Sequence, residues 1–386
     1  MTSSISLSSG SRQADSSYQV VRYQPALKTQ VVELQCHLWS PSPALNAAYL
    51  EWKYERNPYI DAPLIYLAMH DGKAVGMRGF FGTRWEGEHP APSAVVLYAD
   101  DLVIAPQHRN AGLIPRITTA ALDDMATSNY QYTVNLSPGP MTVLSSVAAG
   151  WRSVGFMQPM RRRPWRVVLR RNRERLVRRL PALEQWVATR RRSLADIDAD
   201  HIRRGGRGAR RIALEDAPRC AAMAQLVEQI GGGRIRHVRD AAYFAWRFQN
   251  PLSRYRFLYH ADRQLEGYLV LQEYTSPYAG ADAVNIVDWE ATSIAVQAEL
   301  LRAAIDLTVD RELVVWSVSL SQQLTALLHR SGFKVDPPPS SVTEQRHTLL
   351  VRPIRATELG GDWHFAGRRL LDLHSWDLRM LYSMHG

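Results

Sequence analysis

One segment of this chain occurs twice, roughly half the chain apart. Residues 47–54 read AAYLEWKY and precede Asn57-Pro58, and residues 241–248 read AAYFAWRF and precede Asn250-Pro251. Two copies of a long segment are typical of a duplicated domain and exclude a short-period solenoid. Because both copies carry the aromatic residues, we expect these residues to pack in a core rather than to stack on a sugar. The 386 residues are enough for two ordinary domains.

The order of segments after the two copies is also the same. Each copy leads to two strand-like runs, a strand carrying acidic residues, a helix, a short strand and a helix that ends at Gly155-Phe156 or Gly332-Phe333. This order predicts an α/β chain with mixed sheets in two tandem domains, with residues 165–169 as the closing strand of the first. The predicted units are a flexible tail (1–17), an N-terminal domain (18–169), a basic helical linker (170–211) and a C-terminal domain (212–386).

The excess positive charge lies between the two copies. The chain has a formal net charge of +10, whereas residues 161–211 alone hold 18 arginines and five acidic residues. The rest of the chain is therefore close to neutral. Apolar residues at helical spacing in this segment favour a solvated helical linker. An anionic acceptor or a membrane surface is the next interpretation of residues 161–211, and a nucleic acid ranks last.

The sequence lacks the signals of several classes of protein. No run of roughly 18 apolar residues predicts a transmembrane helix. The serine-rich start lacks the apolar centre of a signal peptide. The two cysteines and the scattered histidines do not have the spacing of metal ligands. We therefore expect a cytoplasmic protein without a metal.

The sharpest local motif is the junction that follows the first acidic strand. A strand-like run ends at Ile104, a loop carries Arg109-x-x-Gly112, and a helical pattern begins at Leu113. A strand–loop–helix junction directs backbone N–H groups and the positive end of a helix toward one point, which suits a diphosphate. Gly112 lets the backbone approach such a group closely.

This junction, with the strand at 130–135 and the Gly-Phe turn, resembles the GNAT superfamily of acyl-CoA-dependent N-acyltransferases. The second copy has neither the Arg nor the Gly at the corresponding residues 288–293. The resemblance thus implies two tandem GNAT-like domains, the second degenerate, with one site for acetyl-CoA or another acyl-CoA. Its cofactor-binding residues would be Leu102, Val103 and Ile104 along the pantetheine arm, Arg109, Asn110, Ala111, Gly112, Leu113 and Ile114 around the pyrophosphate, and Asn135. Ile114 departs from the family pattern, which usually has Gly or Ala.

Acyl transfer to an amine requires a group that takes the amine proton. Asp100 and Asp101, at the end of the strand before the loop, are the candidate catalytic residues, and an ordinary solvated or helix-capping role is the alternative. Neighbouring residues of a strand alternate faces, so we expect only one of them to face the cleft. Trp151 stands where the family usually has a Tyr that acts as the general acid. Solvent, Tyr98 or Tyr132 would then be the proton donor for the leaving thiolate.

The predicted function is therefore an N-acyltransferase that moves an acyl group, in the first instance acetyl, from acyl-CoA to a small-molecule amine. The resemblance suggests an amino sugar or a nucleotide-linked amino sugar of surface polysaccharide as the acceptor. Two alternatives stay open at this point. One is a Fem-like transferase that uses aminoacyl-tRNA, and the other is a noncatalytic GNAT-like binding or scaffold protein.

Overall fold

The computed structural model describes residues 17–88, 91–136, 139–165, 167–169, 193–194, 211–274, 283–336 and 347–383. The predicted tail (1–17) and basic linker (170–211) lie outside these ranges, apart from residues 17, 193–194 and 211. Within these ranges, no helix is both long enough and apolar enough to cross a membrane.

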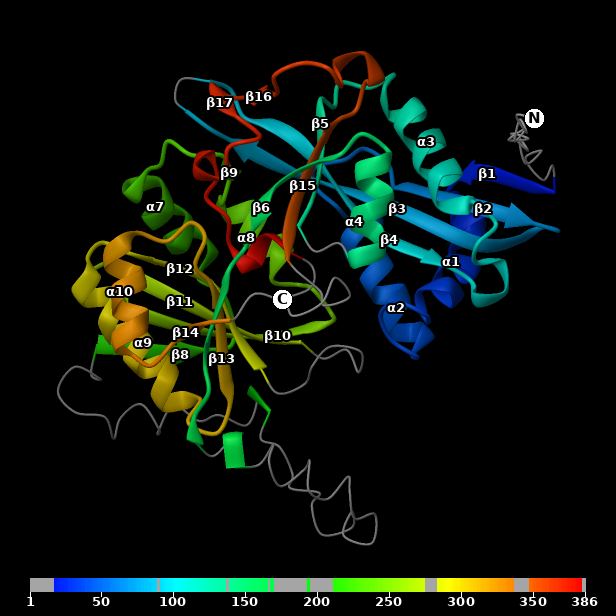
Figure 1. The fold of residues 1–386 in the computed structure, drawn as a ribbon. Helices are drawn as coiled ribbons and strands as arrows, with labels where there is room; N and C mark the ends of the chain where they lie inside the picture. The colour runs from blue at the N-terminus through cyan, green and yellow to red at the C-terminus, as the bar shows by residue number, and fades with distance from the viewer. Residues whose placement is uncertain are drawn as a thin grey trace, which may run out of the picture.

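The described residues form two large mixed sheets with flanking helices and one small two-stranded sheet (Figure 1). The first half contains β1 (Tyr18–Arg22), α1 (Lys28–Gln35), α2 (Pro43–Leu50) with a π-helical turn (Glu51–Glu55), β2 (Leu64–His70), β3 (Lys73–Glu86), β4 (Ala94–Ile104), α3 (Leu113–Met125), β5 (Tyr132–Asn135), α4 (Pro140–Ala148), β6 (Arg152–Phe156) and β7 (Pro159–Arg162). The second half contains β8 (Ile212–Glu215), α7 (Cys220–Ile230), β9 (Arg236–His237), α8 (Ala241–Arg247), β10 (Ser253–Ala261), β11 (Leu265–Tyr274), β12 (Ala283–Ala291), α9 (Ile294–Leu307), β13 (Glu312–Trp316), α10 (Gln322–Arg330), β14 (Lys334–Val335), β15 (Thr348–Pro353), β16 (His364–Phe365) and β17 (Arg368–Arg369).

The two halves have the same topology. The strand order is β1-β2-β3-β4-β5-β15-β6 in one sheet, with β9 added to β3, and β14-β7-β13-β12-β11-β10-β8 in the other. Each sheet contains one parallel pair, β4 with β5 and β12 with β13, and the other pairs are antiparallel. This correspondence confirms the predicted α/β architecture of two tandem domains.

The sheets exchange one interior strand in each direction, and the second half also adds β9 to β3 of the first sheet. β15 pairs with both β5 and β6 of the first half, between which it lies in Figure 1, and β7 pairs with both β13 and β14 of the second half. Neither sheet is therefore complete without the other half. The predicted domain limits, 18–169 and 212–386, stay a prediction; the first sheet takes β15 and β9 from beyond its limits, and the second takes β7.

The expectation of a closing strand at residues 165–169 is wrong. The described residues of this range are helical, and the backbone N–H groups of Val167 and Val168 donate to the carbonyl of Pro164. The fixed φ of a proline suits the start of a helical turn. The strand nearest to this position is β7, which belongs to the second sheet.

The two copies of the repeated segment pack directly against each other. The indole rings of Trp52 and Trp246 are stacked, with centroids 5.2 Å apart and an interplanar angle of 16°. The Trp52 indole N–H donates to the Trp246 carbonyl (2.7 Å), and the Trp246 indole N–H donates to the Trp52 carbonyl (3.1 Å). These reciprocal contacts are those of an approximate two-fold axis. Both rings are buried, in agreement with the expected packing role.

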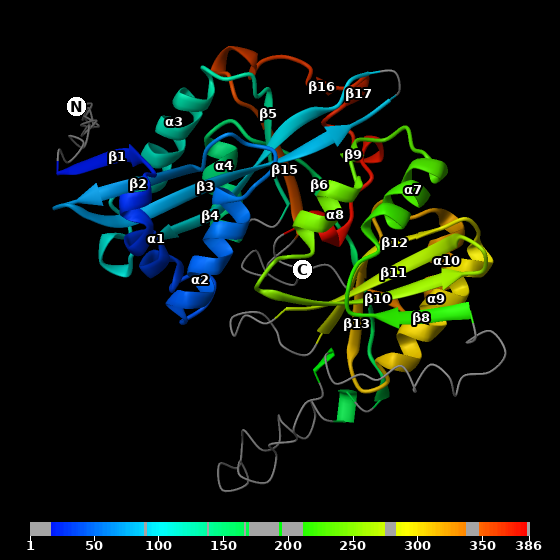
Figure 2. The same ribbon diagram turned by 180° about the vertical axis from the view of Figure 1, so that it is seen from behind.

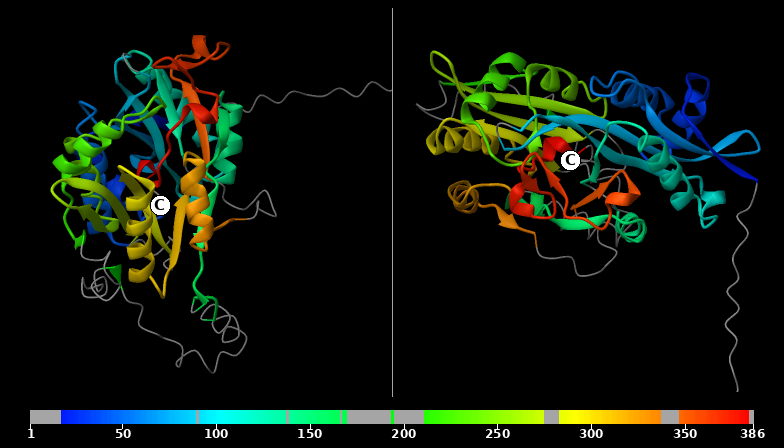
Figure 3. Two further views of the ribbon diagram at one scale, coloured as in Figure 1. Left: turned by 90° about the vertical axis from the view of Figure 1, so that its left-hand side faces the viewer. Right: turned by 90° about the horizontal axis from the view of Figure 1, so that it is seen from above.

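The C-terminal segment lies between the two halves, as Figures 2 and 3 show from behind and from two further sides. The Tyr382 ring stacks on the His237 imidazole at a centroid distance of 3.9 Å. The buried guanidinium of Arg247 donates to the carbonyl groups of Leu381 (2.9 Å) and Ser383 (2.8 Å). This segment is therefore part of the interface rather than a loose end.

We predict that His237 makes the stability depend on pH. Burial, together with the charges of Arg247 and Arg239, lowers the pKa of His237 well below its usual value. Below about pH 6.5 the unfolded chain thus gains a proton that the folded chain excludes, so this residue removes up to about 1.4 kcal/mol of stability per pH unit. Urea unfolding at pH 7.5, 6 and 5 measures this loss. A His237→Gln variant should lose less stability on acidification, and equal losses in both proteins would contradict the prediction.

Candidate functional site

A β-bulge in β4 places both predicted catalytic carboxylates on one face of the sheet. The pairing of β3 with β4 passes from Gly79–Asp100 directly to Met77–Val103, so β4 has one residue more than β3 in this interval. Asp101 has a positive φ of 48° at this point. Such a bulge interrupts the alternation of side chains along a strand. The expectation that Asp100 and Asp101 face opposite sides is therefore wrong.

Both carboxylates contact the ammonium group of one buried lysine. The Lys53 Nζ atom lies 2.7 Å from a carboxylate oxygen of Asp100 and 2.7 Å from one of Asp101, and the Lys53 side chain is 0% exposed. Four aromatic rings surround this ammonium at 5.0–5.3 Å, those of Trp39, Tyr49, Tyr54 and Phe81. Because the ammonium group is buried, removing one partner of an ion pair would leave an unpaired charge in the interior and destabilise the folded protein.

Of the two acids, only Asp100 reaches the surface. Its side chain is 18% exposed, whereas that of Asp101 is 0% exposed. Asp101 also accepts hydrogen bonds from the Trp39 indole (3.1 Å) and the Gln35 amide (3.3 Å). Burial raises the pKa of Asp101, although the Lys53 charge opposes this shift. Asp101 is thus enclosed by protein groups, and an amine can approach only Asp100.

On the other face of β4, a pocket of about 170 Å³ lies between α3 and α4. Its lining consists of Arg78, Leu102, Ile114, Pro115, Thr118, Ser145, Ser146, Ala148, Ala149 and Trp151. Two predicted cofactor-binding residues, Leu102 and Ile114, therefore lie together with Trp151. The side chains of Val103 and Ile104 are instead buried in the cores on opposite faces of the sheet.

The strands beside this pocket diverge. β4 and β5 pair only at Leu97–Thr133 and Tyr98–Val134, so residues 99–104 of β4 continue past the end of this parallel ladder. Asn135 is the last residue of β5, is 8% exposed and pairs with Leu350 of β15. The backbone of β4 thus has an open side next to the pocket, at which an extended ligand can pair.

The loop after β4 is exposed and leads into α3. Residues 109–112 are exposed, and Asn110 and Gly112 have φ angles of +69° and +68°. Gly112 is the N-cap of α3, and its first turn has no side-chain cap, so its N–H groups are available to an anion. A Cβ atom at Gly112 would meet nothing within 4 Å, which leaves room for a ligand above it. Arg109 is part of the same loop, and Leu113 is buried beneath it. These residues fit a diphosphate.

The second copy contains an equivalent of each part except the loop. The strand pairs Gly76–Ile104 and Gly267–Ala291 correspond, and β12 also has a bulge, at Val287, one residue before the equivalent of Asp101. The alignment equates Asp101 with Asp288, Leu102 with Trp289 and Arg78 with Leu269. The two sites can therefore be compared residue by residue.

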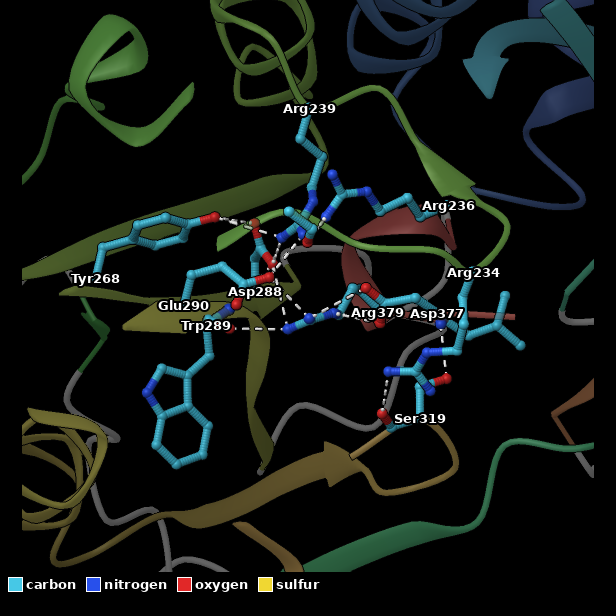
Figure 4. Close-up of polar contacts among 12 residues, drawn as sticks. Arg234, Arg236, Arg239, Tyr268, Asp288, Trp289, Glu290, Ser319, Asp377 and Arg379 are labelled. Carbon is cyan, nitrogen blue, oxygen red and sulfur yellow. Dashed lines mark hydrogen bonds and ion pairs between the residues drawn. The ribbon is translucent and has the colours of Figure 1, made fainter. Parts of the chain in front are cut away.

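In the second copy the C-terminal segment occupies the corresponding backbone (Figure 4). The Arg379 guanidinium donates to the carbonyl of Trp289 (2.8 Å) and pairs with Glu290 (2.8 Å) and Asp377 (3.0 Å). This carbonyl corresponds to that of Leu102, along which the resemblance places the pantetheine arm. The protein's own side chain thus takes the place of a ligand.

The acids on either side of Trp289 are also paired with an arginine of the protein. Arg239 binds Asp288 (2.8 Å) and Glu290 (2.6 Å), as Figure 4 shows. A pocket of about 210 Å³ remains nearby, and the arginines that line it, Arg234, Arg236 and Arg379, all have partners. These contacts agree with the expectation of a degenerate second copy.

Comparison with solved structures identifies the fold. The chain is similar to a GCN5-related N-acetyltransferase from Anabaena variabilis (TM-score 0.55, 14% identity, 88% of this chain and 73% of that chain covered). It is also similar to a probable N-acyltransferase from Enterococcus faecalis (TM-score 0.53, 10% identity, 87% and 72% covered). A third similar structure is a tandem GNAT protein from the clavulanic acid biosynthesis pathway (TM-score 0.51, 11% identity, 88% and 99% covered).

The chain therefore has the GNAT fold in a tandem arrangement, as its sequence predicts. No family model and no curated protein matches the sequence itself.

Sequence reasoning missed Lys53 and Arg78, the two cations next to the predicted site. A signal existed for each of them. The repeated segment has a cation after its tryptophan in both copies, Lys53 and Arg247, and both cations are buried. Arg78 interrupts a strand that is otherwise apolar between Val75 and Phe81, and a buried strand rarely carries a charge without a specific reason.

We predict that Lys53→Met destabilises the protein by about 3–5 kcal/mol, because it leaves two carboxylates without their buried cation. Adding Asp101→Asn to this variant should recover part of the loss, since one of the two charges is then removed. Urea unfolding of the wild type, the two single variants and the double variant measures the coupling. A double variant no more stable than Lys53→Met would contradict the assignment of the ion pair.

Proposed function

We propose that this protein is an acyl-CoA-dependent N-acyltransferase whose acyl-CoA site lies in the first copy. The observation that carries the proposal is the succession of parts along β4: the exposed loop at the start of α3, the open backbone of residues 99–104, and the pocket beside Leu102. The GNAT fold of the similar structures supports the same reading.

Each part of this succession has a role in binding. The N–H groups at Gly112 and the start of α3 hold the diphosphate, with Arg109 beside it. The backbone of residues 102–104 pairs with the pantetheine arm, and the Asn135 amide contacts the same arm or the acceptor. Leu102 and Ile114 line the pocket that receives the end of the arm.

The acceptor amine approaches from the face that holds Asp100 and reaches the acyl carbon along the open side of β4, where residues 99–104 have no β5 partner. It attacks the acyl carbon, a C–N bond forms, and the C–S bond breaks with its electron pair on sulfur. Asp100, the more exposed of the two acids, takes the amine proton directly or through a water molecule. Asp101 and Lys53 are positioning residues that hold Asp100 in place.

Measurement of transfer tests this activity and the acceptor class. We expect acetyl-CoA to release its thiol in the presence of an amino sugar or a nucleotide-linked amino sugar, and an Asp100→Asn variant to lower the rate about 100-fold or more. A panel with simple amines and aminoacyl-tRNA as other acceptors separates the alternatives. Bound coenzyme A without turnover on any acceptor would contradict the enzymatic function and favour a binding protein.

We predict that the charge at position 112 controls affinity for coenzyme A. Gly112→Asp places a carboxylate near the diphosphate and should weaken binding tenfold or more, because one like-charge contact removes about 1.4 kcal/mol or more. Gly112→Asn is the matched control, since Asn has the same shape and also tolerates a positive φ. Calorimetric titration with acetyl-CoA measures both. Equal affinities of the Asp and Asn variants would argue against a diphosphate at this loop.

A further inference from the structure

Arg78 is a buried guanidinium with no side-chain hydrogen bond or ion pair to another described residue. It lies on β3 opposite the β4 bulge and is 3% exposed. Its Nε atom is buried and has no hydrogen-bond partner among the described residues, and its Cζ atom lies 5.7 Å from the centroid of the Phe80 ring. A buried charged group with unmet donors costs considerable free energy unless a ligand or water meets them.

This guanidinium faces the pocket beside Leu102. Arg78 and Leu102 both line the pocket, as does Trp151. Arg78 is the only charged residue of this lining, whose other members have apolar side chains, hydroxyl groups or an indole. A leaving group that carries a negative charge in this pocket therefore finds no side chain that ordinarily gives up a proton near neutral pH. It finds one fixed cation, the Arg78 guanidinium.

The fold itself does not need a cation at this position. The equivalent residue of the second copy is Leu269, which is fully buried in an apolar core. In that copy the bulge lies one residue earlier, at Val287, and Leu269 pairs in register with Trp289, so the two strands pair with a leucine at this position. The arginine occurs in the copy that has the diphosphate loop and an open β4 backbone, and the leucine occurs in the copy without them.

The charges around the bulge balance before any ligand binds. Lys53 and Arg78 are two cations, and Asp100 and Asp101 are two anions, but Lys53 contacts both carboxylates and Arg78 has no ion pair to a described residue. Burial lowers the pKa of the Arg78 guanidinium, an effect that Asp100 opposes. Since guanidinium groups stay protonated at neutral pH, Arg78 keeps a positive charge beside the pocket, and its Nε donor is unmet.

We infer that Arg78 stabilises the coenzyme A thiolate as it leaves. This inference rests on the proposed function. When the C–S bond breaks, its electron pair stays on sulfur, and the guanidinium balances this charge by donating N–H groups to it. No proton needs to reach sulfur within the site.

The test is the ionisation of the thiol of bound coenzyme A, followed by the ultraviolet absorbance of the thiolate. In the wild-type protein the thiol pKa should be about 1–3 units below that of free coenzyme A, because a cation lies next to it. Arg78→Leu, the residue of the second copy, should abolish this shift, and Arg78→Lys should keep part of it. Calorimetry should show that coenzyme A still binds to both variants within about threefold of the wild type, because the diphosphate contacts remain.

Transfer kinetics and stability complete the experiment. Arg78→Leu should lower kcat about 100-fold or more with little change in KM, as expected for a contact made mainly in the transition state. Its urea midpoint should equal or exceed that of the wild type. A wild-type thiol that titrates like free coenzyme A, or a shift that persists in Arg78→Leu, overturns the role of Arg78 alone. Failure of the wild type to bind coenzyme A overturns the proposed function as well.

Discussion

The structure depends on the exchange of one interior strand in each direction between its two large sheets. β15 fills the place between β5 and β6, and β7 fills the equivalent place between β13 and β14. Without β15 or β7, a sheet would have unpaired backbone N–H and C=O groups in its interior. The Trp52–Trp246 stack lies where the two repeated segments meet and fixes their relative orientation through its reciprocal hydrogen bonds.

The two copies differ in what lies at the open side of the strand that carries the acids, β4 in the first copy and β12 in the second. In the first copy, the strand continues past its parallel partner beside a pocket and an exposed loop. In the second, Arg379 satisfies the Trp289 carbonyl, and the acids near it pair with protein arginines. One copy thereby keeps its polar groups available to a ligand, whereas the other uses them to anchor the C-terminal segment.

Much of this arrangement could be predicted from the sequence, because it depends on local patterns. The repeated aromatic segment, the alternating strands and the Arg109–Gly112 loop each have a local signature, and the structure contains the elements that they indicate. The strand exchange has no such signature, because the residue pattern of a strand does not tell which of two sheets it joins. The face of Asp101 depends on one residue with a positive φ, and no pattern in the strand sequence indicates it.

The exchange also changes what the connection between the halves has to do. A chain cut anywhere between β7 and β8 would give two pieces that each carry a strand belonging to the other. Neither piece can complete its own sheet, so the halves are held by interlocking rather than by tethering. The arginine-rich segment is then not needed to keep the two halves together. Its length and composition are free to change under other pressures, which is consistent with a charge so unlike that of the rest of the chain.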